Sequence, residues 1–176
     1  MFKQFLSHII VYNVIKKIIE MKISKKFEPI INGLAAGFVI AILALLTFES
    51  PFGVWLMFSF GSSALIVFVF YDSEFAQPRN IFFGHLLAIC VGILANSLLG
   101  VSFFSLGLSV TLSVTLMMYF KIIHPPAAAN PLIAIFADVS YDFILFPVIA
   151  GSIILILLSI LINKFLFKRK YPKRFI

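Results

Sequence analysis

The residue types best suited to chemistry gather in one short stretch, KIIHPPAAANPL at positions 121–132. It places His124 beside three prolines in a strongly apolar chain. Proline fixes its own φ and pushes the preceding residue out of the α region, so a short helix is predicted to begin at about Pro126. The first N–H groups of that helix lack intrahelical partners and carry the positive end of the helix dipole. Such a helix start inside a membrane suits a small anion.

A matching break is expected in FGSSA at positions 60–64, where Gly61 ends one helical piece and Ser62 and Ser63 can cap the next. Two helix starts would then meet near the membrane centre and form a site lined by backbone. The alternative, in which the prolines only kink a helix and the alanines only pack, is less favoured because three prolines fall within seven residues. The predicted substrate-binding residues come from both breaks: Gly61, Ser62, Ser63, His124, Pro125, Pro126, Ala127 and Ala128.

Three more polar residues are candidates for the anion's pathway or for coupling to protons: Arg79, His85 and Asn130. His85 lies in a segment without charged side chains, and an ionisable residue at membrane depth is a functional candidate. His124 could donate to the anion or carry a proton, and it could equally cap backbone carbonyls at a turn. Arg79 either attracts the anion at the mouth of the pathway or anchors a span at the membrane surface.

The composition requires these segments to lie in a membrane. Hydrophobic residues make up 62% of the chain and charged residues 12%, too few to coat a soluble domain. Basic residues cluster before residue 27 and after residue 163, which predicts that both termini are cytoplasmic. No folded polar domain carries these charges, so a nucleic-acid binder is excluded. Three separated histidines and one cysteine make a poor metal set and no enzyme motif is present, so we expect no metal, no cofactor and no enzymatic activity.

The charge pattern divides the chain into three parts. Residues 1–28 are predicted to form an amphipathic helix on the cytoplasmic membrane surface, residues 29–163 the transmembrane domain, and residues 164–176 a basic cytoplasmic tail. Six apolar segments follow one another in the transmembrane domain: Ile30–Phe48, Pro51–Tyr71, two crossings within 80–120 broken near 96–107, the stretch after Lys121 up to Ala137, and Phe143–Asn163. Small residues at every fourth position, at 84–96 and 105–113, are expected at helix–helix contacts.

The predicted fold class is therefore all-α, a polytopic helical membrane protein. Each half reads as span, broken segment, span, because FGSSALIVF at 60–68 can be laid against PPAAANPLIAIF at 125–136, and the runs 84–96 and 151–163 both go from Gly to Asn. This pattern predicts a two-fold inverted repeat of three segments, as in secondary transporters, with the second segment of each half broken or re-entrant. Six crossings result if both broken segments cross and four if both are re-entrant. The loop charges favour six.

Several of these motifs, taken in order, resemble the HPP family of integral membrane proteins: SPFG at 50–53, FGSSA at 60–64, AQPRN at 76–80, GHLL at 84–87 and HPPAAA at 124–129. The resemblance covers residues 29–163. It implies a transporter or channel for a small monovalent anion, most directly nitrite, because some plant and cyanobacterial members are implicated in nitrite transport. The chain departs from the family pattern at Ala128, at Asn130-Pro131 and at Ser62, so its anion can differ.

The expected partners are thus a small inorganic anion and the lipid bilayer, with protons and a homo-oligomer as further candidates and no nucleic acid. The expected location is a bacterial inner membrane. The alternative function is a membrane-embedded enzyme or an assembly subunit that uses His85 and His124. A purely structural subunit is a third hypothesis, and uptake into proteoliposomes separates transport from both.

Overall fold

The structure, a computed structural model, describes residues 26–173, and within that range it contains helices and connections but no strand. The chain divides into two compact units, Met1–Ile31 and Asn32–Ile176, and the candidate site lies in the second. The predicted surface helix at 1–28 lies outside the described residues except for its last three positions. The all-α prediction is confirmed for the described part of the chain.

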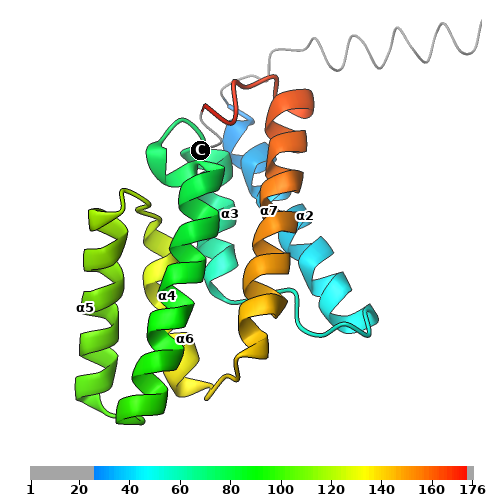
Figure 1. The fold of residues 1–176 in the computed structure, drawn as a ribbon. Coiled ribbons are helices and arrows are strands. Elements are labelled where there is room, and N and C mark those ends of the chain that lie inside the picture. The colour runs from blue at the N-terminus through cyan, green and yellow to red at the C-terminus, as the bar shows by residue number, and fades with distance from the viewer. Residues whose placement is uncertain (1–25, 174–176) are drawn as a thin grey trace, which may run out of the picture. The chain divides into compact units, whose positions relative to one another are not determined.

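The helical elements follow one another along the chain (Figure 1). Their bounds are α2 (Glu28–Glu49), α3 (Ser59–Val69), η1 (Glu74–Ala76), α4 (Pro78–Leu99), α5 (Phe103–Tyr119), η2 (Pro125–Ala129), α6 (Asn130–Phe136), η3 (Ile144–Ile149), α7 (Ala150–Leu161) and η4 (Ile162–Leu166).

Three helical stretches are long and apolar enough to cross a bilayer, namely α2, α4 and the run Ile144–Leu166, which is made of η3, α7 and η4 and is kinked at Phe146. A hydrocarbon core of about 30 Å needs roughly 20 apolar residues in a helix. These stretches have 22, 22 and 23 residues, and α5 follows with 17. The prediction of long apolar helices at both ends of the transmembrane domain, and of two helices within 80–120, is therefore confirmed.

Two segments are much shorter, as the sequence predicted. The helix α3 has 11 residues, and a rise of about 1.5 Å per residue lets it cover only about half of a bilayer core. The pair η2 and α6 has five and seven residues. The predicted helix start at Pro126 is one residue late, because the 3-10 turns of η2 begin at Pro125 and α-helical geometry begins only at Asn130.

The predicted position of the first break is wrong. Gly61, Ser62 and Ser63 lie inside α3, so Gly61 ends no helix and the two serines cap none. The irregular part of this segment is residues 50–58, upstream of the helix. Its geometry is held by Thr47, whose hydroxyl accepts the N–H groups of Trp55 and Leu56 at 2.9 and 3.1 Å. This contact gives the irregular backbone partners before the helix starts at Ser59.

Two polar contacts show which ends of the helices lie together. At one end Arg79 donates to the carbonyl of Lys121 at 2.8 Å, while Asn96 donates to Asp138 at 2.7 Å at the other. Figure 1 shows α4 and α6 running from the first end to the second, and α3, α5 and α7 running back. The C-terminal segment returns to the first end. This alternation favours six passages over four, and the number of membrane crossings stays a prediction.

Small residues let α4 approach the second short segment closely, as the stripe at 84–96 predicted. A Cβ atom on Gly84 would lie 2.9 Å from the Cβ of His124. About two helical turns further along α4, a Cβ on Gly92 would lie 2.6 Å from the Cα of Pro131 and 2.8 Å from the Cβ of Ala134. Any side chain at either position would therefore push α4 away from the segment that carries His124.

Candidate functional site

The polar centre of the molecule is a buried cluster contributed by four separate segments. Ser63 comes from α3, His85 from α4, His124 from the residue before η2, and Asn130 from the start of α6. All four are fully shielded, with 0% of their surface exposed. Buried polar groups are costly unless hydrogen-bonded, so the cluster must satisfy itself internally.

Ser63 joins the two histidines. Its hydroxyl oxygen lies 2.9 Å from the Nε2 atom of His85 and 2.8 Å from the Nε2 atom of His124. The two imidazole rings face each other edge to face, with their centroids 4.8 Å apart. A single hydroxyl therefore bridges two titratable rings.

The outer nitrogen of each ring also has a partner. The Nδ1 atom of His124 lies 2.7 Å from the backbone carbonyl of Phe75. The side-chain amide nitrogen of Asn130 lies 3.1 Å from both the Nδ1 atom and the carbonyl oxygen of His85. Ser59 completes the chain, because its hydroxyl donates to the Asn130 side-chain oxygen at 2.8 Å.

These partners assign a direction to every hydrogen bond. A carbonyl can only accept, so His124 carries its proton on Nδ1 and its Nε2 accepts when the ring is neutral. The His85 carbonyl likewise requires the NH₂ group of Asn130 beside it, so Nδ1 of His85 accepts and Nε2 carries the proton. His85 therefore donates to Ser63, and Ser63 donates to His124. We call this chain of hydrogen bonds the polar relay. Each of its members donates to the next, in the order Ser59, Asn130, His85, Ser63, His124 and the Phe75 carbonyl.

The relay has room for one added proton. The Ser63 hydroxyl has a second acceptor, the carbonyl oxygen of Ser59 at 3.2 Å. If His124 becomes protonated on Nε2, Ser63 can accept from both rings and turn its own proton to that carbonyl. Protonation of His85 on Nδ1 is disfavoured, because the NH₂ group of Asn130 points at that nitrogen. The added proton therefore belongs on His124.

Neighbouring side chains hold His124 in place. Asn80 donates to the carbonyl of Ile123 at 3.0 Å, and Arg79 donates to the carbonyls of Lys121 and Phe120 at 2.8 and 3.3 Å. Both residues lie in the first turn of α4, so they fix the backbone just before His124. The Phe60 ring packs edge-on against His85 with centroids 5.2 Å apart.

The structure brings some of the predicted site residues together and separates others. His85, Ser63, His124 and Asn130 meet in the polar relay. Ala127 is buried beside Gly84, and Ala128 is partly buried in the same small cluster. Gly61 and Ser62 lie on the exposed side of α3. Ser62, Pro125 and Pro126 line two adjoining, largely apolar grooves of ≈ 640 and ≈ 670 Å³. Arg79 lies away from the relay.

The start of η2 offers few free backbone donors. Pro125 and Pro126 have no N–H, and the N–H of Ala127 donates to the His124 carbonyl at 2.9 Å.

The sequence analysis missed two groups that belong to the relay, the Ser59 hydroxyl and the Phe75 carbonyl. Ser59 could have been found from its spacing of four residues from Ser63, which places both on one face of a helix. The Phe75 carbonyl gives no sequence signal. Among the described residues no three His, Cys, Asp or Glu side chains gather to hold a metal.

The HPP transmembrane region matches residues 21–172, which is most of the chain and includes all members of the relay. The chain belongs to the HPP family. Two transmembrane proteins of Dictyostelium discoideum are similar to this HPP protein, each 33% identical over 144 residues. The matched part is 76% of this chain and 50% and 46% of theirs, so the chain spans about half the length of these curated relatives. No solved structure matches the chain significantly. Membership confirms the resemblance and makes the HPP protein an integral membrane protein.

Proposed function

We propose that this HPP protein transports a small monovalent anion of the nitrite class across the membrane together with a proton, and that the polar relay accepts this proton. The observation that carries the proposal is the Ser63 bridge between His85 and His124 at the place where both short segments meet. Buried hydrogen-bonded histidines are common in soluble proteins. A membrane domain rarely buries two of them without a functional reason.

The energetics favour a proton. Moving one negative charge into a negative-inside compartment costs about 2.3 kcal/mol per 100 mV of membrane potential. Accumulation of an anion therefore needs a compensating cation. The relay has one position for an added proton, on Nε2 of His124, and a rotating hydroxyl that adapts to it. Protonated His124 would also attract the anion.

The proposed anion site lies on the wall shared by Ser59, Ser62, Pro125 and Pro126. Ser59 belongs to the relay and also lines the groove of ≈ 670 Å³. The exposed Ser62 lines the same wall, and its hydroxyl can donate to a small anion. A homo-oligomer, a bacterial inner membrane and cytoplasmic termini remain predictions that accompany this proposal.

The proposal includes the inverted repeat, and two reciprocal contacts support it. Gly84, in the third segment of the first half, packs against His124 and Ala127 in the break of the second half. Gly151, in the third segment of the second half, packs against the Trp55 carbonyl in the break of the first half and against the Phe60 ring at the start of α3. The sequence offset that relates Gly84 to Gly151 also relates Ser63 to Asn130, and both of these side chains bind His85.

A second candidate is a membrane-embedded enzyme, which the geometry of Ser63 favours. Its hydroxyl, the His124 base and the orienting Phe75 carbonyl stand in the order nucleophile, base and third group. Two features count against it: Ser63 is fully buried, and His85 donates to its oxygen. Covalent labelling of Ser63 by a fluorophosphonate would support the enzyme.

Uptake of isotopically labelled nitrite into proteoliposomes tests the proposed function. Purified wild-type protein should raise uptake above that of protein-free liposomes, and unlabelled nitrite should compete. Uptake equal to that of protein-free liposomes across physiological pH would contradict the proposal that the protein transports nitrite.

A further inference from the structure

A polar pocket of ≈ 400 Å³ lies at the end of the molecule where α4 begins. It is lined by polar side chains from the α3–α4 connection, the first turn of α4, the α5–η2 connection and the C-terminal segment: Asp72, Glu74, Gln77, Arg79, Asn80, Lys121 and Lys173. The two grooves beside α3 have mostly apolar walls. Of these three cavities, this pocket has the most polar wall.

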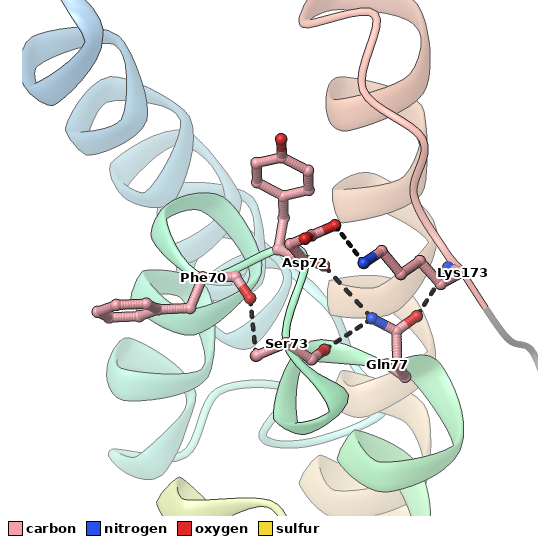
Figure 2. Close-up of polar contacts among 6 residues, drawn as sticks. Phe70, Asp72, Ser73, Gln77 and Lys173 are labelled. Atoms are coloured by element: carbon pink, nitrogen blue, oxygen red, sulfur yellow. Dashed lines mark hydrogen bonds and ion pairs between the residues drawn. The ribbon is translucent and has the colours of Figure 1, made fainter.

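Its walls are pre-formed by a set of hydrogen bonds (Figure 2). The Gln77 amide donates to the carbonyls of Tyr71 and Ser73 at 3.3 and 2.8 Å, and its oxygen accepts the backbone N–H of Lys173 at 2.8 Å. Tyr171 is buried and donates to the Ala76 carbonyl at 2.7 Å. Burial raises the pKa of the Tyr171 hydroxyl, so it stays a donor at physiological pH. A pre-formed wall lowers the ordering cost of binding.

The charges in the pocket do not all cancel. Lys173 pairs with Asp72 at 2.6 Å (Figure 2). Arg79 donates to two neutral carbonyls and keeps its positive charge. The side chains of Lys121 and Glu74 make no hydrogen bond or ion pair with the residues that the structure describes. The start of α4 adds the positive end of a helix dipole, so the balance is positive.

The pocket shares its walls with the end of the relay. Glu74 precedes Phe75, whose carbonyl accepts from His124. Asn80 lines the pocket and holds the Ile123 carbonyl next to His124. The two chain segments that position the His124 ring are therefore among the four that form the pocket.

We infer that this pocket is a vestibule that binds the small monovalent anion at the end of its pathway next to the relay, with Lys121 as the binding charge and Arg79 as the group that positions it. The inference rests on the proposed function for the identity of the ligand. Glu74 weakens the hold of the vestibule on an anion, because a carboxylate in the wall repels negative charge.

Thermal unfolding of the detergent-solubilised protein tests the vestibule without requiring transport. A ligand that binds only the folded state raises the unfolding temperature, and the stabilisation grows with the logarithm of one plus the ratio of ligand concentration to Kd. Nitrite should stabilise the wild-type protein more than gluconate does at the same ionic strength. Lys121→Gln should raise the Kd for nitrite, obtained from this concentration dependence, by about three- to five-fold, as expected for an exposed charge pair. Glu74→Gln should lower it, and Lys121→Arg should keep it near the wild-type value.

The control is Lys164→Gln, which removes the same charge from a lysine that does not line the pocket. Equal effects of Lys121→Gln and Lys164→Gln, or no difference between nitrite and gluconate for the wild type, would overturn the vestibule. Nitrite uptake without this pattern of thermal shifts would contradict the vestibule and support the proposed transport. The pattern of thermal shifts without nitrite uptake would support the pocket as a binding site and contradict the proposed transport.

Discussion

Ser63 and His124 are joined by a hydrogen bond of 2.8 Å between the hydroxyl oxygen and the Nε2 atom of the ring. Because the Phe75 carbonyl fixes the proton of the neutral ring on Nδ1, Nε2 is the nitrogen that can accept another proton. The hydroxyl that touches it can turn to the Ser59 carbonyl when that happens. This relationship makes Ser63 the adjustable member of the relay.

Replacement of Ser63 by alanine should therefore affect both stability and transport. It leaves the His85 Nε2–H without an acceptor and His124 Nε2 without a donor in a fully buried place. We expect a loss of about 1–3 kcal/mol in the free energy of unfolding and loss of proton-dependent uptake. Ser97→Ala is the control, because this serine of α4 is exposed, bonds only to the Leu94 carbonyl of its own helix and lines neither the relay nor the grooves. Equal effects of the two variants would count against the bridge.

Asn130 sets the tautomer of His85 in this scheme. Asn130→Asp replaces the donor beside Nδ1 with an acceptor, so the His85 proton should move from Nε2 to Nδ1 and Ser63 should then donate to His85. Imidazole ¹⁵N chemical shifts in histidine-labelled protein, recorded in a His8→Gln background, measure this directly. The two histidines should show opposite tautomers in the parent protein. The same tautomer in both would contradict the assigned direction of the relay.

The close approach of α4 to the second short segment predicts a steric effect at Gly84. A Cβ there would lie 2.9 Å from the Cβ of His124 and 3.2 Å from the Ile122 carbonyl. We expect Gly84→Ala to destabilise the fold by about 1–3 kcal/mol through overpacking. Gly107→Ala, on α5 with no atom within 4 Å of its Cβ position, should be neutral or stabilise by about 0.5–1 kcal/mol. Unfolding midpoints in detergent distinguish the two, and an unchanged Gly84→Ala midpoint would argue against this packing.

The alternating ends of the helices predict the labelling pattern of single cysteines. In a Cys90→Ala background, cysteines at positions 72 and 121 should react from one side of the membrane and a cysteine at position 138 from the other. Arg79 bonds to Lys121 at the first end and Asn96 to Asp138 at the second, which motivates the choice. Reaction of positions 121 and 138 from the same side would restore the four-crossing version.

Sequence reasoning found the elements and half of the site. Apolar length and charge gave the long helices, and proline chemistry located the break after His124 within one residue. The first break was misplaced because Thr47 holds it through contacts eight and nine residues away, which no local turn signal reports. His85 and His124 were both candidates. The sequence could not show that one hydroxyl joins them, because this depends on how α3 packs against two distant segments. The Phe75 carbonyl has no side-chain signature.

The central claim, that the relay moves a proton with the anion, is tested most directly by nitrite uptake into proteoliposomes under an imposed inward proton gradient at constant membrane potential. Uptake into protein-free liposomes is subtracted, because the uncharged acid enters passively. We predict that the gradient accelerates wild-type uptake several-fold and leaves uptake by His124→Asn unchanged. If the gradient has no effect on the wild type, coupling to protons is contradicted. If it accelerates His124→Asn equally, a proton moves but His124 does not carry it.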